Sequence, residues 1–302
     1  MAKQPMKDVI VLLPGILGSV LERDGDEVWA PSPGAIGRAL WRLGRNLNDL
    51  ALGDDPWESD DPGDGVRATR LMPDVHIIPG FWGIDGYSGI SSMIRSTFDV
   101  TDGVNFFEFP YDWRRDNRVA ARALKKLADE SLHARRKDVP DAKLVLVGHS
   151  MGGLVSRYYL ECLDGWRDTR ALITFGTPYR GSINAVDFLA NGFVKKLGPL
   201  KLIDLSKLLH SLTSVYQLLP VYPCIDLGDG YVRPAETANR IEGLDESRAK
   251  AALKFHHDIR DATAAHDRSA YSIHSIVGIT QGTKQSARLD GGRIVLDEKG
   301  FD

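Results

Sequence analysis

Hydrophobic residues in this chain form short apolar runs separated by longer amphipathic stretches. Five runs predict strands, and they are Val9–Leu13, Val104–Phe109, Leu144–Val147, Ala171–Phe175 and Tyr271–Ile279. Between the second and third runs, apolar residues recur at helical spacing from about Asp116, a suitable N-cap, to Lys137. Strands that alternate with helices predict an α/β fold: a mainly parallel sheet with helices on both faces.

Two stretches depart from this alternation. Residues 20–100 are rich in Gly, Pro, Asp and Trp, and we expect a loop-rich, lid-like excursion there. Residues 182–250 contain leucines at helical spacing, especially over Lys201–Leu219, and we expect a helical cap inserted after a core strand. The whole chain, 1–302, is therefore predicted to be a single domain with two insertions.

The first of these stretches contains six acidic residues with no basic residue between them. They are Asp54, Asp55, Glu58, Asp60, Asp61 and Asp64. Their spacing does not match an EF-hand calcium loop, so we expect a solvated loop and no metal site.

Composition narrows the class of protein. The chain has 302 residues, of which 43% are hydrophobic and 26% charged, as in a globular protein with a sizeable core. The net charge of −3 gives no reason to expect a nucleic-acid partner. Cys162 and Cys224 could form one bridge but not a disulfide framework. We see no signal peptide and no apolar run long enough for a transmembrane segment, and we expect a cytoplasmic protein.

The clearest chemical signal is Gly148-His149-Ser150-Met151-Gly152, which follows an apolar strand and precedes a helical pattern. This is the G-x-S-x-G nucleophile elbow in its strand–turn–helix context. The turn demands a strained serine backbone with small neighbours, and the helix dipole favours negative charge beside it. We expect Ser150 to be a catalytic nucleophile whose hydroxyl stands exposed on the turn.

A serine nucleophile needs donors for the tetrahedral oxyanion. The first is the backbone N–H of Met151, the residue after the nucleophile. The second should come from a loop after an earlier strand, and Ile16 in Pro14-Gly15-Ile16-Leu17-Gly18 fits that place. Phe81, in Pro79-Gly80-Phe81-Trp82-Gly83, is the alternative donor.

The general base and its acid are harder to locate. The histidines that follow Ser150 are His210, His256, His257, His266 and His274. Two polar segments that are expected to be helical offer candidates for the base: His256-His257-Asp258 and His266-Asp267. Asp229, in Gly228-Asp229-Gly230, is expected in a turn. The triad acid and base therefore stay unassigned.

Four elements resemble the lecithin:cholesterol acyltransferase family, which includes phospholipase A-type members. Pro110-Tyr111-Asp112-Trp113-Arg114 looks like its P-Y-D-W-R signature, and Leu13 to Ser19 resembles its V-P-G-x-L-G-N. Pro79-Gly80-Phe81 resembles its later P-G-F element. Gly176-Thr177-Pro178 to Ser182 is similar to a segment of many lipases. These four elements also follow one another in the order typical of the family, over residues 9–182.

The resemblance implies an α/β-hydrolase core with a mobile lid and a cap that gathers acyl chains. It implies hydrolysis or transfer of the acyl group of a lipid ester, phospholipid or acylglycerol, at a membrane or lipid interface. Ser150 would form the acyl-enzyme, Ile16 and Met151 would hold the oxyanion, and no cofactor would be needed.

The family's acid lies in a G-D-[GD]-T-V-like segment, with its histidine tens of residues later. The sequence contains no such segment before Asp302. We therefore expect a truncated C-terminus, with the acid and base beyond Asp302. Two alternatives stay open: a carboxylesterase for small soluble esters, and a catalytically dead module that binds a lipid or a partner.

Overall fold

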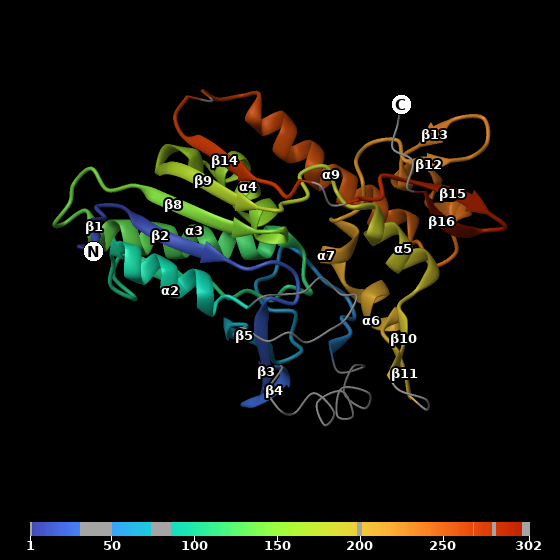
Figure 1. Cartoon of the computed structure of the whole chain (residues 1–302), viewed down its shortest axis with the longest axis horizontal. Helices are drawn as coiled ribbons and strands as arrows, with labels where there is room; N and C mark the ends of the chain where they lie inside the picture. Colours follow the sequence, from blue (N-terminus) through green and yellow to red (C-terminus); the bar gives the residue numbers. More distant parts are fainter. Residues whose placement is uncertain are drawn as a thin grey trace.

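The computed structural model describes residues 2–30, 50–73, 86–197, 201–267, 269–279 and 282–297 (Figure 1). Its centre is a five-stranded sheet with the order β14-β9-β8-β2-β7. All four pairings in this sheet are parallel. The strands are β2 (Val9–Leu13), β7 (Phe106–Glu108), β8 (Leu144–His149), β9 (Thr169–Phe175) and β14 (Ser272–Ile276). Each predicted apolar run overlaps one of them, and the α/β fold is confirmed.

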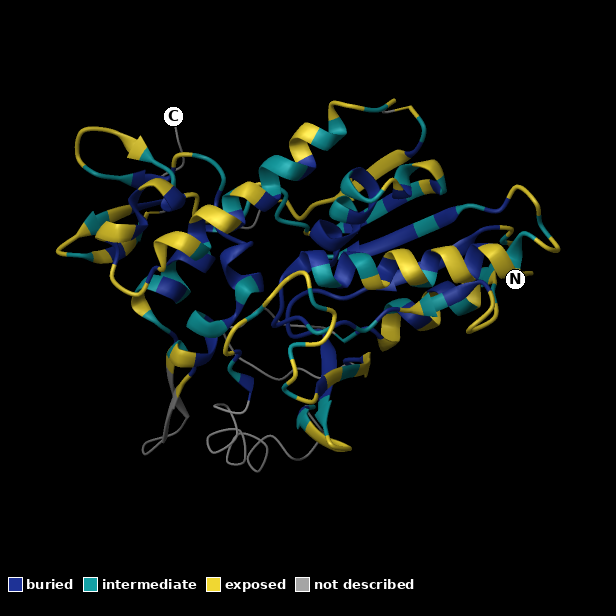
Figure 2. Ribbon diagram, turned by 180° about the vertical axis from the view of Figure 1, so that it is seen from behind, coloured by how far each residue is buried: buried dark blue, intermediate teal, exposed yellow. Residues whose placement is uncertain are grey.

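Central strands are buried, as a parallel sheet requires (Figure 2). Every residue of β2 is buried, whereas every residue of β14, at one edge, is exposed. Helix α3 (Asn117–Arg135) begins where the sequence predicted, because the Asp116 side chain accepts a hydrogen bond from the Arg118 N–H at 2.8 Å. It packs beside α4 (Met151–Cys162), and α9 (Glu246–Thr263) packs against α4.

Residues 20–100 contain more regular structure than the predicted loop-rich excursion. Strands β3 (Ser19–Arg23), β4 (Asp26–Trp29) and β5 (Val66–Leu71) form an antiparallel sheet in the order β4-β3-β5. Helix α2 (Ser88–Thr97) follows, and β6 (Phe98–Asp99) pairs with β1 (Gln4–Pro5). Phe81, the alternative oxyanion donor, lies outside the described residues.

The acidic segment is a loop in which most acidic residues are exposed, as predicted, but some of its carboxylates pair with distant arginines. Asp55, whose side chain is 3% exposed, pairs with Arg115 at 2.9 Å. Asp64 pairs with Arg114 at 2.9 Å, while the more exposed Asp60 pairs with Arg122 at 2.8 Å. These arginines lie more than 45 positions from their acidic partners in the sequence. A search for basic residues close to the acidic ones along the chain therefore does not find them. Among the described residues, no cluster of His, Cys, Asp or Glu is arranged to hold a metal.

Residues 182–250 contain strands as well as the expected helices. The helices are α5 (Ile183–Asn191), α6 (Ser206–Ser211), α7 (Thr213–Tyr216), α8 (Pro234–Thr237) and the start of α9, with the 3-10 turn η3 (Ala238–Arg240). A second 3-10 turn, η2 (Gly165–Arg167), follows α4. A hairpin of β10 (Val194–Leu197) and β11 (Lys201–Asp204) occupies the start of the leucine-rich stretch, where we expected helix.

The last described strands join this second region and not the central sheet. Strands β15 (Ser286–Asp290) and β16 (Arg293–Asp297) form a four-stranded sheet with β12 (Ile225–Asp226) and β13 (Tyr231–Val232). Figure 1 shows this sheet beside α5, away from the parallel sheet.

Cys162 and Cys224 are both free, so the possible bridge is not formed. Within the described part of the chain, no helix combines the length and apolarity that crossing a bilayer requires.

Candidate functional site

Ser150 lies at the turn between β8 and α4 with a backbone conformation that is rare for a residue with a side chain. Its φ is 50° and its ψ is −120°. Such a conformation costs about 1–3 kcal/mol and persists only where its surroundings enforce it. Here the Ser150 N–H donates to the Phe175 carbonyl at 2.9 Å, and the Ser150 carbonyl accepts from Gly153 at 3.1 Å. The end of β9 and the first turn of α4 thus hold the strained turn in place.

Two glycines let the loop after β2 pack directly on this turn. A Cβ on Gly152 would lie 2.5 Å from the Pro14 carbonyl oxygen, and one on Gly15 would lie 3.0 Å from the Ser150 Cβ. This packing leaves Ser150 only 5% exposed. The Ser150 hydroxyl is not among the fully buried side-chain oxygens without a partner in the described residues, so the expected exposure of that oxygen stays a prediction.

Several polar backbone groups of the Pro14–Gly18 loop are fixed by hydrogen bonds. The Pro14 carbonyl accepts from the Tyr111 hydroxyl at 2.8 Å, and the Leu17 carbonyl accepts from Trp29 Nε1 at 3.0 Å. The Gly15 carbonyl accepts from the Gly18 N–H at 3.1 Å. Within the described residues, the Ile16 N–H donates to no protein group.

The Met151 N–H is free in the same way. Met151 is the first residue of α4, and first-turn amides have no acceptor within their own helix. No hydrogen bond from this amide occurs in the described part of the chain. Both amides that the sequence proposed as oxyanion donors, Ile16 and Met151, are thus unpaired on two segments whose backbones touch.

The P-Y-D-W-R segment explains how the loop is supported, a role that the sequence did not reveal. Besides Tyr111, Trp113 contributes, because its Nε1 donates to the Ser19 carbonyl at 3.0 Å just after the loop. Arg114 is fully buried and pairs with Asp112 at 2.6 Å. The sequence signal for this supporting role was the pair Tyr111 and Trp113, because both side chains can donate a hydrogen bond while buried in a core.

The structure brings none of the described candidate histidines into hydrogen-bond contact with Ser150. His210 contacts the Leu189 carbonyl, and His256 contacts the Gln217 carbonyl. His266 pairs with Glu161. Glu161 follows Ser150 by eleven positions on α4, which corresponds to about 16 Å between these two residues at the rise of an α-helix. His274 contacts the Ser272 hydroxyl on the exposed edge strand.

Neither triad residue is therefore located by these contacts. Asp229 lies in the turn between β12 and β13, as expected. Which residues serve as acid and base stays a prediction.

His149 is the histidine beside the serine, and it is already engaged. Its Nδ1 lies 2.8 Å from the Tyr87 hydroxyl, and its burial lowers the pKa of the imidazole. This contact holds the imidazole against Tyr87 as part of the turn.

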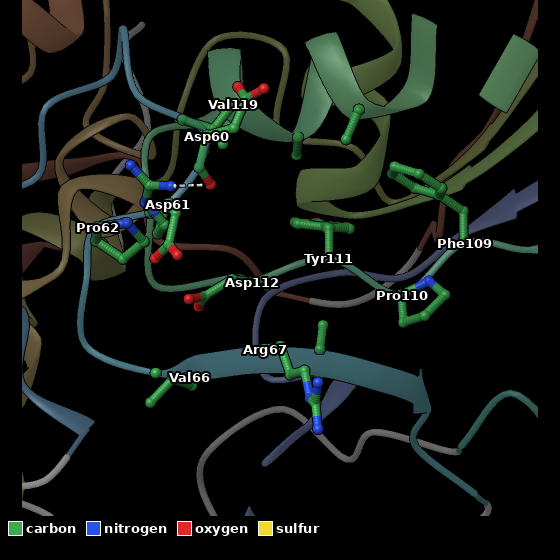
Figure 3. A pocket seen from close by; sticks show the side chains of 15 residues that line it. Asp60, Asp61, Pro62, Val66, Arg67, Phe109, Pro110, Tyr111, Asp112 and Val119 are labelled. Atoms are coloured by element: carbon green, nitrogen blue, oxygen red, sulfur yellow. Dashed lines mark hydrogen bonds between the residues drawn. The ribbon is translucent and has the colours of Figure 1, made fainter. Parts of the chain in front are cut away.

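A cavity of about 470 Å³ lies on another side of the P-Y-D-W-R segment (Figure 3). Its walls come from the acidic loop, the start of β5, Phe109–Asp112 and the first half of α3. Neither Ser150 nor the proposed oxyanion donors line it. The cavity is therefore separate from the candidate site. Tyr111 connects the two, because it lines the cavity and its hydroxyl donates to the Pro14 carbonyl.

Comparison with known proteins decides the family. A family model described as lecithin:cholesterol acyltransferase matches residues 94–280. The chain belongs to the lecithin:cholesterol acyltransferase family. The matched part of this family member runs from α2 to just past β14 and includes the Ser150 turn. The resemblance inferred from the four motifs is confirmed.

Curated relatives agree with this family. The human protein named lysosomal phospholipase A and acyltransferase is 28% identical over 177 residues, which cover 51% of this chain and 41% of the relative. The phosphatidylcholine-sterol acyltransferase of Gallus gallus is 28% identical over 212 residues, 60% of this chain and 48% of the relative. The chain thus spans less than half the length of these two relatives.

A solved structure supports the fold alone. A chain in the crystal structure of the Tle4–Tli4 complex superposes with a TM-score of 0.60 at 15% sequence identity. The match covers 99% of this chain and 85% of that one.

Proposed function

We propose that this chain provides the nucleophile and the oxyanion site of a serine acylhydrolase or O-acyltransferase that acts on ester lipids. The observation that carries the proposal is the Ser150 turn, with its positive φ, packed against a loop that presents an unpaired amide. The Ser150 backbone is strained in this way, and strained backbone concentrates at functional sites. The lipid substrate class is supported by the names of the related family members.

In the proposed reaction, Ser150 Oγ attacks the ester carbonyl carbon while a general base takes the serine proton. The carbonyl oxygen becomes an oxyanion, and the Ile16 and Met151 amides donate hydrogen bonds to it. Collapse of this intermediate breaks the bond to the alcohol, which leaves with the proton. Water or an acceptor alcohol then attacks acyl-Ser150 by the same steps in reverse.

The two amides can act together because Gly15 and Gly152 allow the loop and the helix terminus to touch. The dipole of α4 adds a favourable field for the developing negative charge. No step in this mechanism requires a metal or an organic cofactor. Phe81 remains an alternative donor that the described structure does not address.

A covalent probe tests the nucleophile. Full-length protein treated with a fluorophosphonate and then digested should carry the label on the peptide that contains Ser150. Ser150→Ala should abolish labelling and ester turnover, whereas Ser272→Ala, a serine on the exposed edge strand, should leave both unchanged. Label on a different residue of the wild-type protein would overturn the assignment.

Substrate choice tests the lipid class. We expect faster turnover of phosphatidylcholine in vesicles than of p-nitrophenyl acetate. Transfer of the acyl group to an added long-chain alcohol would identify an acyltransferase. Preference for the acetate would identify a small-ester carboxylesterase. Vesicle binding without Ser150-dependent turnover would favour the dead binding module, which the unlocated base keeps open.

A further inference from the structure

Tyr87 links the two halves of the proposed oxyanion site. Its hydroxyl accepts a hydrogen bond from the Gly15 N–H at 2.7 Å and lies 2.8 Å from His149 Nδ1. Gly15 belongs to the loop that carries Ile16, and His149 belongs to the turn that carries Ser150 and Met151. One phenol oxygen therefore touches both segments.

The direction of these hydrogen bonds follows from the donors available. A backbone N–H can only donate, so the Tyr87 oxygen is the acceptor for Gly15. The arrangement that leaves no buried donor unpaired gives the phenol proton to His149, with Nδ1 as the acceptor. This places the imidazole proton on Nε2. Burial supports neutral forms of both groups, since it raises the pKa of Tyr87 and lowers that of His149.

Tyr87 itself is rigidly placed. It is 4% exposed, and its ring meets the His149 ring edge-on with 5.8 Å between centroids. Its N–H donates to the Met72 carbonyl at 2.9 Å, and the Met72 N–H donates to the Gly18 carbonyl at 2.9 Å. The backbone of Tyr87 is thus tied to the end of the same loop that its hydroxyl holds at Gly15.

The other side-chain anchors of the loop do not reach the turn. Tyr111 comes from the P-Y-D-W-R segment and Trp29 from β4, and both hold loop carbonyls. Among the described residues, Tyr87 makes the side-chain hydrogen bonds that join the loop to the turn. It therefore helps to set the spacing between the Ile16 and Met151 amides. Donors in an oxyanion hole must lie about 2.7–3.1 Å from the oxyanion, so small displacements are costly.

We propose that Tyr87 is a positioning residue that fixes the Pro14–Gly18 loop against the Ser150 turn through Gly15 and His149. This inference rests on the proposed function. Tyr87 acts through the backbone that it orients and does not itself touch the substrate.

Kinetics of Tyr87→Phe test this role, because the substitution removes the hydroxyl and keeps the ring. We expect kcat of the full-length protein to fall about tenfold with KM changed less than twofold, a smaller loss than the 10²–10³-fold typical of deleting an oxyanion donor. Fluorophosphonate labelling of Ser150 should slow by a similar factor. Tyr159→Phe is the matched control, since Tyr159 is a buried tyrosine farther along α4. An equal, small effect of both substitutions would overturn the proposal.

A double-mutant cycle between Tyr87 and His149 separates a positioning role of Tyr87 from a general loss of packing. The Asn side-chain oxygen lies near the place of histidine Nδ1, so His149→Asn should keep kcat within about threefold, whereas His149→Leu should behave like Tyr87→Phe. The double variant Tyr87→Phe/His149→Leu should be no worse than either single variant, because the two residues act through one contact. Additive losses would contradict the direct link.

The tautomer gives a readout that needs no turnover. Nitrogen-15 NMR of labelled histidine should show His149, assigned by its loss in His149→Asn, protonated at Nε2 in the wild-type protein. Tyr87→Phe should introduce the Nδ1–H form. An Nδ1–H tautomer in the wild-type protein would overturn the hydrogen-bond direction even if Ser150 is the nucleophile. Failure of Ser150 labelling would instead overturn the proposed function and leave this result standing.

Discussion

Gly152 shows how a single missing side chain permits the site to form. The loop after β2 approaches the first turn of α4 so closely that its carbonyls occupy the space of a Cβ at this position. The motif predicts a glycine here, but only the structure identifies what it touches. The contact joins the Ile16 and Met151 segments at the backbone.

Gly152→Ala should therefore destabilise the protein and disturb the site together. The Cβ would lie 2.5 Å from the Pro14 oxygen and 2.8 Å from the Leu13 oxygen, and rigid backbone must move to admit it. We expect a loss of about 3 kcal/mol in the free energy of unfolding, at the upper end for overpacking. Urea denaturation measures it.

The control for this substitution is Gly53→Ala. A Cβ on Gly53 meets no atom within 4 Å, so the change should stay within about 0.5 kcal/mol. If the two substitutions cost the same, the loop does not press on α4 in the way described.

At the scale of elements, Arg115 holds the acidic loop between β4 and β5 at several points. The Arg115 guanidinium donates to Asp55 at 2.9 Å and to the carbonyls of Asp60, Pro56 and Ser59 at 2.7, 3.1 and 3.0 Å. Because Arg115 precedes α3 directly, these contacts attach the loop to the start of that helix.

Arg115→Gln should release this loop without unfolding the molecule. Four hydrogen bonds to four residues cannot be replaced by one shorter amide, and a buried carboxylate at Asp55 would lose its charged partner. Hydrogen–deuterium exchange with mass spectrometry should show residues 53–64 exchanging about tenfold faster, with the central sheet unchanged.

Arg122→Gln provides the comparison, since Arg122 pairs with an Asp60 carboxylate that is 83% exposed. Such surface pairs contribute little, so exchange in the loop should remain close to wild type. Faster exchange in the central strands of Arg115→Gln would instead mean that this arginine supports the whole fold.

For the molecule as a whole, stability should fall in mild acid. Burial lowers the pKa of His256 in the folded state, and the neighbouring His257 lowers it further, while its hydrogen bond to the Gln217 carbonyl acts in the opposite direction. Below a pH of about 6.5 the unfolded chain therefore binds more protons than the folded one, and protonation favours unfolding. His149 contributes with the same sign.

We expect the free energy of unfolding to decrease as the pH falls from 7 to 5, measured by urea denaturation at several pH values. His256→Gln should make this decrease smaller without removing it, because His149 still contributes. His133→Gln, on the exposed surface of α3, should leave the pH dependence as in the wild type. A stability that rises toward pH 5 would contradict the sign.

Local patterns were sufficient for much of the architecture. Strand β2, the Asp116 cap of α3 and the Ser150 turn followed from periodicity and from the conformational needs of short segments. The family also followed from motifs, because each motif is a run of adjacent residues. These features depend on interactions within a few positions, which a sequence displays directly.

Contacts between distant residues decided the rest. The pairing of Asp55 with Arg115, the return of β15 to β12 and the bridge from Gly15 through Tyr87 to His149 each join residues about 60 or more positions apart. The burial of Ser150 belongs to the same group, since it arises from the loop above it. The sequence determined where the chain bends and which residues can react. Only packing between remote segments determined which side chains hold those residues in place, because many distant pairs are chemically possible and the assembled core admits few of them.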